Sequence, residues 1–333
     1  MEARNYDKIV NRDEITDAAA SAFANAGQKV PEKYIRAEEV LDGVVVGEDE
    51  SYELPVVDMA RLLDPESSAL EIAKLGDACR NWGFFQLTNH GVDEEVIQRM
   101  KDSTVQFFSS PLESKKKVAV RENGFEGYGH HYSRASKGKL DWAESVILIT
   151  QPPQDRNMEM WPTNPPTFRD ALEVYSVEMI SLAKKLLGFM AADLGVEREA
   201  LEGAFTGKRQ SMAIHYYPPC THREKIRKGG RWFPVRPLPG AFVVNVADIL
   251  DVLSNGAYRS VEHRVLPDAE RGRTTVVIFQ EAAAAGGLVA PLPELVTKGG
   301  GEARYRSIEL EEYIKGNFNA LADGTRFIES LRI

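Results

Sequence analysis

The chain has 333 residues, of which 43% are hydrophobic, and its formal net charge at pH 7 is −9. A chain of this size can bury a large core, whereas the negative charge argues against nucleic-acid binding, which needs a basic face. The first residues lack the apolar run of a secretory signal, and no segment is apolar enough to span a membrane. Cys79 and Cys220 are interpreted as thiols of a reducing compartment, so we expect a cytoplasmic protein that acts on small molecules.

The first half of the chain alternates between short strands and amphipathic helices. Residues 1–52 are polar and are predicted to form an N-terminal extension with a short helix near Asp13–Ala26. The strand predictions that follow are Leu54–Met59 and the buried-type Gly83–Thr88, and the helix predictions are Ser68–Trp82 and Asp93–Ser109. The helices are predicted from apolar residues that recur every three to four positions.

The second half of the chain changes from helix to strand. A proline-rich linker, Gln151–Pro166, leads into a long helix predicted at Phe168–Leu194. From Ser211 onward, short apolar runs are broken by proline and glycine, which is typical of an all-β core. We expect strands at Trp232–Val235, Ala241–Val246 and Thr274–Phe279, followed by a helical tail over Ile308–Ile333.

Three residues near the end of the β core have side chains that can bind a metal ion or a carboxylate. His263 is followed ten positions later by Arg273, and Thr275 comes two residues after that. The imidazole can bind a metal ion, the guanidinium can form a two-pronged contact with a carboxylate, and the hydroxyl can add a hydrogen bond. A non-haem Fe(II) oxygenase holds its metal with two histidines and one carboxylate. The usual source of the other two ligands is a His-x-Asp motif, and none occurs in this chain.

Other interpretations of these residues stay open at the level of sequence. His222 and Glu224 form a His-x-carboxylate pair that would point the same way on a strand and could complete a ligand set with His263. A polar turn is the favoured interpretation, because the pair begins two residues after Cys220. His263 alone could be a structural loop residue. Tyr216 and Tyr217 are adjacent, so only one of them can face inward.

Several ordered motifs give the chain a resemblance to a known family. They are Asn81–Leu87, Asn89–Gly91, Glu126–Gly129, Leu140–Ala143, Trp161–Pro162, Tyr216–Cys220, Pro239–Asn245 and Leu253–Gly256. With these, the chain resembles the plant 2-oxoglutarate/Fe(II)-dependent dioxygenases of the senescence-related, codeine-O-demethylase-like and norcoclaurine-synthase-like branch. The resemblance implies an α+β fold, in which a distorted double-stranded β-helix, or jelly roll, is wrapped by N-terminal and C-terminal helices.

The resemblance also implies cofactors and residue roles. The family uses Fe(II) and 2-oxoglutarate to oxidise a hydrophobic plant metabolite or hormone, as a monomer. The residues at matching positions are His263 for iron, Arg273, Thr275 and Tyr217 for 2-oxoglutarate, and Tyr128 and Phe279 for the organic-substrate pocket. The family usually has asparagine before the tyrosine pair, whereas this chain has His215.

One departure from the family concerns the segment that normally carries His-x-Asp. Roughly two dozen residues are absent near Lys225 and Ile226, which is about two strands of an eight-stranded roll. We therefore divide the chain into the extension 1–52, an N-terminal dioxygenase-type region 53–165, and 166–333, which holds the long helix, an incomplete jelly roll at 211–280 and the tail. Exposed strand edges predict self-association. The alternative to an active oxidoreductase is an inactive family member, or a splice or annotation variant, with a scaffold or binding role.

Overall fold

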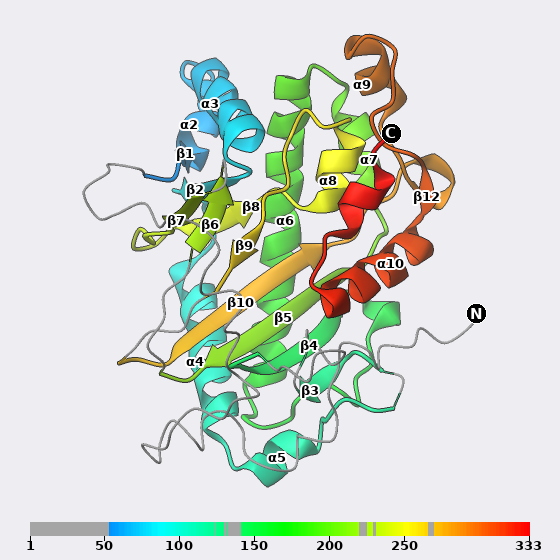
Figure 1. The fold of residues 1–333 in the computed structure, drawn as a ribbon. Helices are drawn as coiled ribbons and strands as arrows, with labels where there is room; N and C mark the ends of the chain where they lie inside the picture. Colours follow the sequence, from blue (N-terminus) through cyan, green and yellow to red (C-terminus); the bar gives the residue numbers. More distant parts are fainter. Residues whose placement is uncertain are drawn as a thin grey trace.

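The computed structural model describes residues 53–122, 124–129, 131, 141–219, 225–228, 231–265 and 270–333. The predicted N-terminal extension 1–52, with its helix at Asp13–Ala26, lies outside these ranges, and so do His222 and Glu224. Within them, helices and sheets are interleaved along the chain (Figure 1), which confirms the α+β class.

The N-terminal segment follows the predicted order of strands and helices. Its elements are β1 (Val56–Asp58), α2 (Met59–Leu63), α3 (Ser68–Asn81), β2 (Phe84–Thr88), α4 (Glu94–Ser109) and α5 (Leu112–Lys116). The first strand is shorter than predicted because Asp58 caps α2. Its carboxylate accepts hydrogen bonds from the backbone N–H groups of Ala60 and Arg61, at 2.9 and 3.4 Å.

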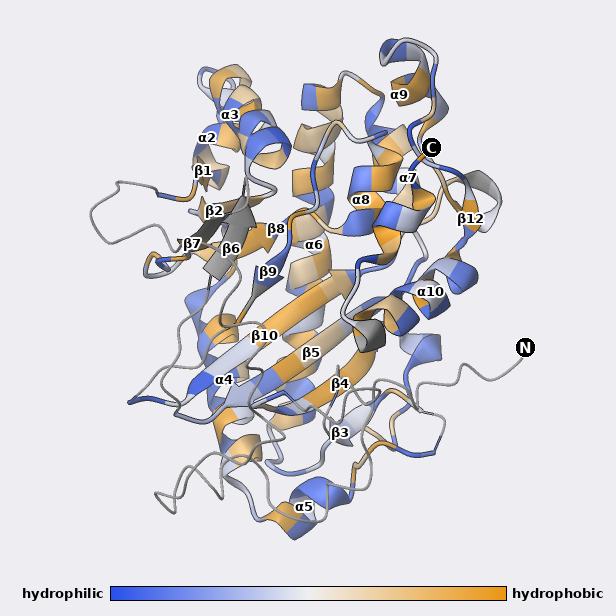
Figure 2. Cartoon of the chain, viewed as in Figure 1, coloured by the Kyte–Doolittle hydropathy of each residue, from blue (hydrophilic) through white to orange (hydrophobic). Residues whose placement is uncertain are grey.

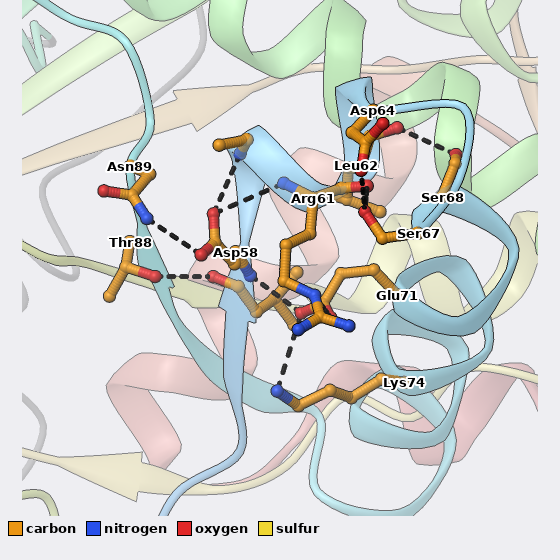
Figure 3. Close-up of polar contacts among 12 residues, drawn as sticks. Asp58, Arg61, Leu62, Asp64, Ser67, Ser68, Glu71, Lys74, Thr88 and Asn89 are labelled. Carbon is orange, nitrogen blue, oxygen red and sulfur yellow. Dashed lines mark hydrogen bonds and ion pairs between the residues drawn. The ribbon is translucent and has the colours of Figure 1, made fainter.

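A buried carboxylate holds this segment together (Figure 3). Glu71 of α3 accepts a hydrogen bond from the backbone N–H of Asp58 at 2.8 Å and forms an ion pair with Arg61 at 3.3 Å. The Asn89 amide donates to the Asp58 carboxylate at 2.8 Å. Because β1 pairs in parallel with β2, these contacts join both strands to α2 and α3. We assign this cluster a structural role.

The long helix α6 (Phe168–Leu194) spans the predicted range and lies behind the largest sheet in Figure 1. It ends at Gly195, whose φ of 65° is a left-handed conformation that glycine adopts at little cost. The shorter α7 (Arg198–Phe205) follows. Leu182 and Met190 of α6 belong to the same buried cluster as Met212 and Ile214 of the sheet.

The largest sheet has four antiparallel strands in the order β10-β5-β4-β3. Their bounds are β3 (Gly127–Gly129), β4 (Glu144–Gln151), β5 (Gln210–Tyr217) and β10 (Arg273–Gln280). The strand predicted at Thr274–Phe279 is therefore confirmed, with one more residue at each end. β5 and β10 are paired along their whole length.

Three smaller sheets complete the β structure. The first has the order β1-β2-β8, the second β7-β6-β9 and the third β11-β12. The new strands are β6 (Lys225–Lys228), β7 (Arg231–Pro234), β8 (Phe242–Asn245), β9 (His263–Arg264), β11 (Leu288–Val289) and β12 (Ile308–Glu309). β8 is shorter than the predicted Ala241–Val246 because it pairs only with Phe84–Leu87 of β2.

Several strands lie at the open edges of their sheets. Within the described ranges, β10, β8 and β9 each have a strand partner on one side only. Two large apolar side chains on these strands are exposed, Val243 of β8 by 44% and Phe279 of β10 by 42%. Open edges and exposed apolar side chains on the same strands are what a roll with missing strands would leave.

The C-terminal part packs a second, smaller core beside the sheets. Its elements are α8 (Asp248–Leu253), α9 (Pro293–Lys298), α10 (Leu310–Asp323) and a 3₁₀ turn at Phe327–Leu331. Tyr305, Tyr313, Ile328 and Leu331 are buried together there. The helical tail predicted at Ile308–Ile333 is confirmed as an α-helix at Leu310–Asp323 only, because Ile308–Glu309 forms β12 and Phe327–Leu331 forms the 3₁₀ turn.

Candidate functional site

The strand register places the predicted 2-oxoglutarate residues on one face of the large sheet. Arg273 lies directly opposite Tyr217, and Thr275 lies directly opposite His215. Side chains that are opposite in register, or two residues apart on one strand, share a face. The alternate residues, such as Ile214 and Tyr216, pack into the main core. We call the face that carries Arg273 and Thr275, which is turned away from α6, the front face.

The Thr275 hydroxyl group is an unsatisfied polar group in the part of the chain that the structure describes. Its oxygen is buried and has no hydrogen-bond partner within the described ranges. Leaving a buried hydroxyl unsatisfied costs about 1–3 kcal/mol, so such a group points to a missing ligand or water. Arg273 is two residues away on the same face, about 7 Å along the strand. A guanidinium beside an unsatisfied hydroxyl fits the carboxylate of a 2-oxo acid.

His215 adds a polar group that the family pattern does not predict. Its ring nitrogen Nδ1 lies 2.7 Å from the hydroxyl oxygen of Ser145, which is opposite it on β4. Burial lowers the pKa of the His215 imidazole to about 4, so the ring is neutral at physiological pH. Ser145, His215 and Thr275 thus form a polar row across three adjacent strands.

His263 lies on a different sheet, at the start of β9. It pairs with Ile226 of β6, and its ring packs edge-on against Phe84 at a centroid distance of 5.0 Å. Its Nδ1 lies 3.3 Å from the carbonyl oxygen of Val261. A protonated Nδ1 would donate to that carbonyl and leave Nε2 as the nitrogen for a metal ion.

The donors around His263 do not fit an iron site. In the part of the chain that the structure describes, no three histidine, cysteine, aspartate or glutamate side chains come together as a metal-binding group. The speculative ligands His222 and Glu224 lie outside that part. Because a non-haem iron centre needs two histidines and a carboxylate, His263 alone is insufficient.

The loop before His263 is held by residues that sequence reasoning missed. The backbone N–H of Ser260 donates to the Asp251 carboxylate at 2.9 Å, and the Ser260 hydroxyl bonds to Asp248. Arg326, which immediately precedes the C-terminal 3₁₀ turn, donates to the carbonyl oxygen of Ser260 at 3.2 Å and to Asp248 at 3.3 Å. These contacts position the entry to β9. No sequence signal could have found Arg326, because it lies 66 residues from Ser260.

The two predicted pocket residues lie on opposite faces of the large sheet. Phe279 is on the front face, opposite Ser211. Tyr128 is opposite Val146 on the helix-covered face, where it is buried. Its hydroxyl donates to Glu144 at 2.8 Å, and Lys115 donates to the same carboxylate oxygen at 2.6 Å. The structure therefore does not bring Tyr128 together with Phe279, and it gives Tyr128 a place in a buried ion-pair network.

The chain matches two family models. Residues 54–164 match the N-terminal region of non-haem dioxygenases in morphine synthesis, and residues 222–282 match the 2OG-Fe(II) oxygenase superfamily. It is 37% identical to S-norcoclaurine synthase 1 of Coptis japonica, over 92% of this chain and 93% of that protein. It is 33% identical to codeine O-demethylase of Papaver somniferum, over 87% and 88%.

Solved structures agree with these relatives. The structure of JOX2 in complex with 2OG, Fe and JA superimposes on this chain with a TM-score of 0.81 and 25% identity. The match includes 95% of this chain and 98% of the JOX2 chain. The rice dioxygenase for auxin oxidation covers 84% of this chain with 98% of its own, at a TM-score of 0.68 and 27% identity. These neighbours confirm the jelly-roll fold class.

The alignments leave positions that this chain does not fill. The alignment with the Coptis protein has 331 positions but contains only 92% of the 333 residues, about 306, which leaves about 25 positions opposite gaps. The alignment with 2-oxoglutarate-dependent dioxygenase 11 of Oryza sativa has 342 positions and contains 95%, about 316, which leaves about 26. This total matches the size of the segment that we infer to be missing.

Proposed function

The chain belongs to the plant 2-oxoglutarate/Fe(II)-dependent dioxygenase family, and on that premise we propose that it binds a 2-oxo acid on the front face but does not complete an iron site. The observation that carries the proposal is the buried Thr275 hydroxyl without a partner, two residues from Arg273. In its present form the chain is thus a small-molecule-binding protein that does not carry out the family's oxidation.

Each front-face residue has a defined part in binding the acid. Arg273 supplies two parallel N–H donors to one carboxylate, and Thr275 donates its hydroxyl to the same group. Tyr217, directly opposite Arg273, adds its phenol. In the family, O₂ is the oxidant, and Fe(II) together with 2-oxoglutarate would activate it. Here the residues that would hold the acid are present, whereas among the described residues His263 alone matches a family iron ligand.

The binding half of the proposal can be tested by calorimetry with 2-oxoglutarate in a metal-free buffer. Thr275→Val removes the hydroxyl and keeps the shape, so we expect affinity to fall by about tenfold, which corresponds to one hydrogen bond to a charged group. Thr274→Val is the matched control, because Thr274 is exposed and faces the other way. Equal affinities of the two variants would contradict the proposed role of Thr275.

The iron half can be tested by anaerobic titration with Fe(II) in the presence of 2-oxoglutarate. A single imidazole lacks both the chelate and the charge-balancing carboxylate, so we expect no visible charge-transfer band. A stoichiometric band that His263→Ala abolishes would refute the proposal. If Glu224→Ala abolished the band as well, a rebuilt site with His222 and Glu224 would replace it.

A second function is favoured by the unfilled alignment positions. A longer form of the protein, with the missing strands and a His-x-Asp motif, would oxidise a hydrophobic small molecule. Tyr217 on one side of the gap and His263 and Arg273 on the other keep the family order. Genomic sequence upstream of the Lys225 codon that encodes His-x-Asp would make the present chain a splice or annotation variant.

Repair of the chain tests this second function directly. Lys225 and Ile226 are consecutive residues of β6, so an inserted strand pair belongs before Lys225 rather than between the two. We expect the repaired protein to couple O₂ uptake to succinate release, and Arg273→Ala to weaken its use of 2-oxoglutarate. Several folded, repaired proteins without coupled turnover would count against this function.

We further propose that the chain self-associates through β8 and β10 and resides in the cytoplasm. Both strands end their sheets within the described ranges and expose Val243 and Phe279. Cys79 is a buried free thiol, which suits a reducing compartment. None of the helices that the structure describes is long and apolar enough to cross a membrane. Sedimentation at rising concentration tests the association, and a monomer at all concentrations would refute it.

A further inference from the structure

The front face changes from polar to apolar along β10. Its first residues on this face are Arg273 and Thr275, and the next two are Val277 and Phe279. Figure 2 shows the same change along the strand, which is hydrophilic where it begins and hydrophobic toward its other end. The neighbouring strands follow this order, since Ser145 and His215 lie level with Thr275, whereas Ile147 and Ala213 lie level with Val277.

The polar end offers two hydrogen-bonding groups side by side. Residues directly opposite on antiparallel strands have Cα atoms about 4.5–5.5 Å apart, so His215 and Thr275 can contact the same ligand atom. Ser145 fixes the His215 ring at 2.7 Å. The Thr275 hydroxyl is buried and without a partner in the described part of the chain. A carboxylate that reaches Arg273 would satisfy this hydroxyl.

The apolar end offers a surface that only an apolar group can use. Thr275 and Phe279 are four residues apart, or about 13 Å along the strand. The Phe279 side chain is 42% exposed, and Val277 is half-buried. Covering these side chains with a hydrocarbon removes apolar surface from water, which is favourable.

A dicarboxylate matches this face at one end only. Among the described strand residues of the front face, Arg273 is the single cation. In the absence of an iron site, a second carboxylate bound along β10 would lie against Val277 and Phe279 without a positive partner. Burying a charge in that way is costly. A monocarboxylic acid with an apolar tail avoids this cost.

We propose that the front face binds an amphipathic monocarboxylic acid, with its carboxylate at Arg273, Thr275 and His215 and its apolar tail along Val277 to Phe279. This inference rests on the proposed function, because the same Arg273 and Thr275 receive the carboxylate. It adds the ligand class, in which His215 helps to hold the carboxylate and Phe279 selects for the apolar tail.

Calorimetry on the full chain in metal-free buffer, with 2-oxooctanoate and 2-oxoglutarate as probes, tests the proposal. We expect 2-oxooctanoate to bind at least tenfold more tightly. Phe279→Ser should reduce this preference to threefold or less by weakening 2-oxooctanoate, whereas Thr275→Val should weaken both acids. Val243→Ser is the matched control, because Val243 is equally exposed, at 44%, but lies on another sheet.

His215→Asn tests whether the imidazole contributes to carboxylate binding without being required for folding. Asparagine keeps a hydrogen-bonding group at this position but is shorter than histidine, so both acids should bind more weakly while the unfolding transition at pH 7 stays cooperative. Octan-2-one, which has the tail without the carboxylate, should not bind at the same site.

The outcomes distinguish the two proposals. If 2-oxoglutarate binds and 2-oxooctanoate gains nothing, or if the gain survives Phe279→Ser, the amphipathic ligand is refuted and the proposed function stands. Tight binding of octan-2-one would also refute it, because the carboxylate would then be dispensable. If neither acid binds, the proposed function falls and this inference falls with it.

Discussion

Acidification should remove the stability that one buried residue, His215, contributes to this protein. The imidazole is buried on the front face, and burial lowers its pKa to about 4 in the folded protein. In the unfolded chain its pKa returns to about 6.5. As the pH falls below about 6.5, the unfolded state therefore binds a proton at this residue, whereas the folded state does not bind one until the pH approaches 4. The stability that His215 contributes is complete above pH 6.5 and is lost as the pH falls toward 4.

The size of the effect follows from the difference between the two pKa values. A difference of about 2.5 units corresponds to about 3 kcal/mol in the free energy of unfolding. This is a large part of the 5–15 kcal/mol that stabilises a typical domain. His215→Asn removes the titrating group, so the free energy of unfolding of this variant should not fall by about 3 kcal/mol on acidification.

A second buried group acts in the opposite direction. Burial raises the pKa of the Glu126 carboxyl to about 7, even though the backbone N–H of Ile149 donates to it at 2.6 Å. Here the folded state takes up the proton first, so stability rises as the pH falls from about 7 to about 4.5. The two contributions are similar in size and nearly cancel over that range. The unsubstituted protein alone therefore cannot reveal either of them.

Urea unfolding of three proteins separates the two contributions: the unsubstituted chain, His215→Asn and Glu126→Gln, each measured between pH 7 and pH 4. The stability of His215→Asn relative to the unsubstituted chain should rise by about 3 kcal/mol as the pH falls, whatever the offset at pH 7. Glu126→Gln should lose relative stability over the same range. A difference between His215→Asn and the unsubstituted chain that does not change with pH would refute the reasoning, because it would mean that the imidazole is protonated in the folded state.

Two further predictions concern contacts between helices and strands. Gly76→Ala should destabilise the protein by about 2–4 kcal/mol, because the added Cβ would lie 1.9 Å from the Asp193 carboxylate; Gly203→Ala, with open space around the new Cβ, is the control for the same urea assay and should be neutral or slightly stabilising. Lys115→Met should cost about 3–5 kcal/mol, because it leaves the Glu144 carboxylate buried without its partner at 2.6 Å. The double variant Lys115→Met with Glu144→Gln should recover part of that loss in thermal unfolding, and no recovery would contradict the ion-pair explanation.

The features that depend on local patterns could be predicted from the amino-acid sequence. The helices at Ser68–Asn81, Glu94–Ser109 and Phe168–Leu194 were predictable because apolar residues recur at helical spacing within each segment. The shared face of Arg273 and Thr275 was predictable because side chains alternate along a strand. The family and its cofactors were also readable, since the motifs that carry them are contiguous.

The contacts between strands and between distant residues became visible only in the folded chain. Strand register put Tyr128 and Phe279 on opposite faces, and alternation alone cannot say which face of a strand turns toward a helix. The Ser145–His215 hydrogen bond joins residues 70 positions apart, and Arg326 reaches Ser260 across 66. Such contacts arise from packing of the whole chain, and no local periodicity encodes them.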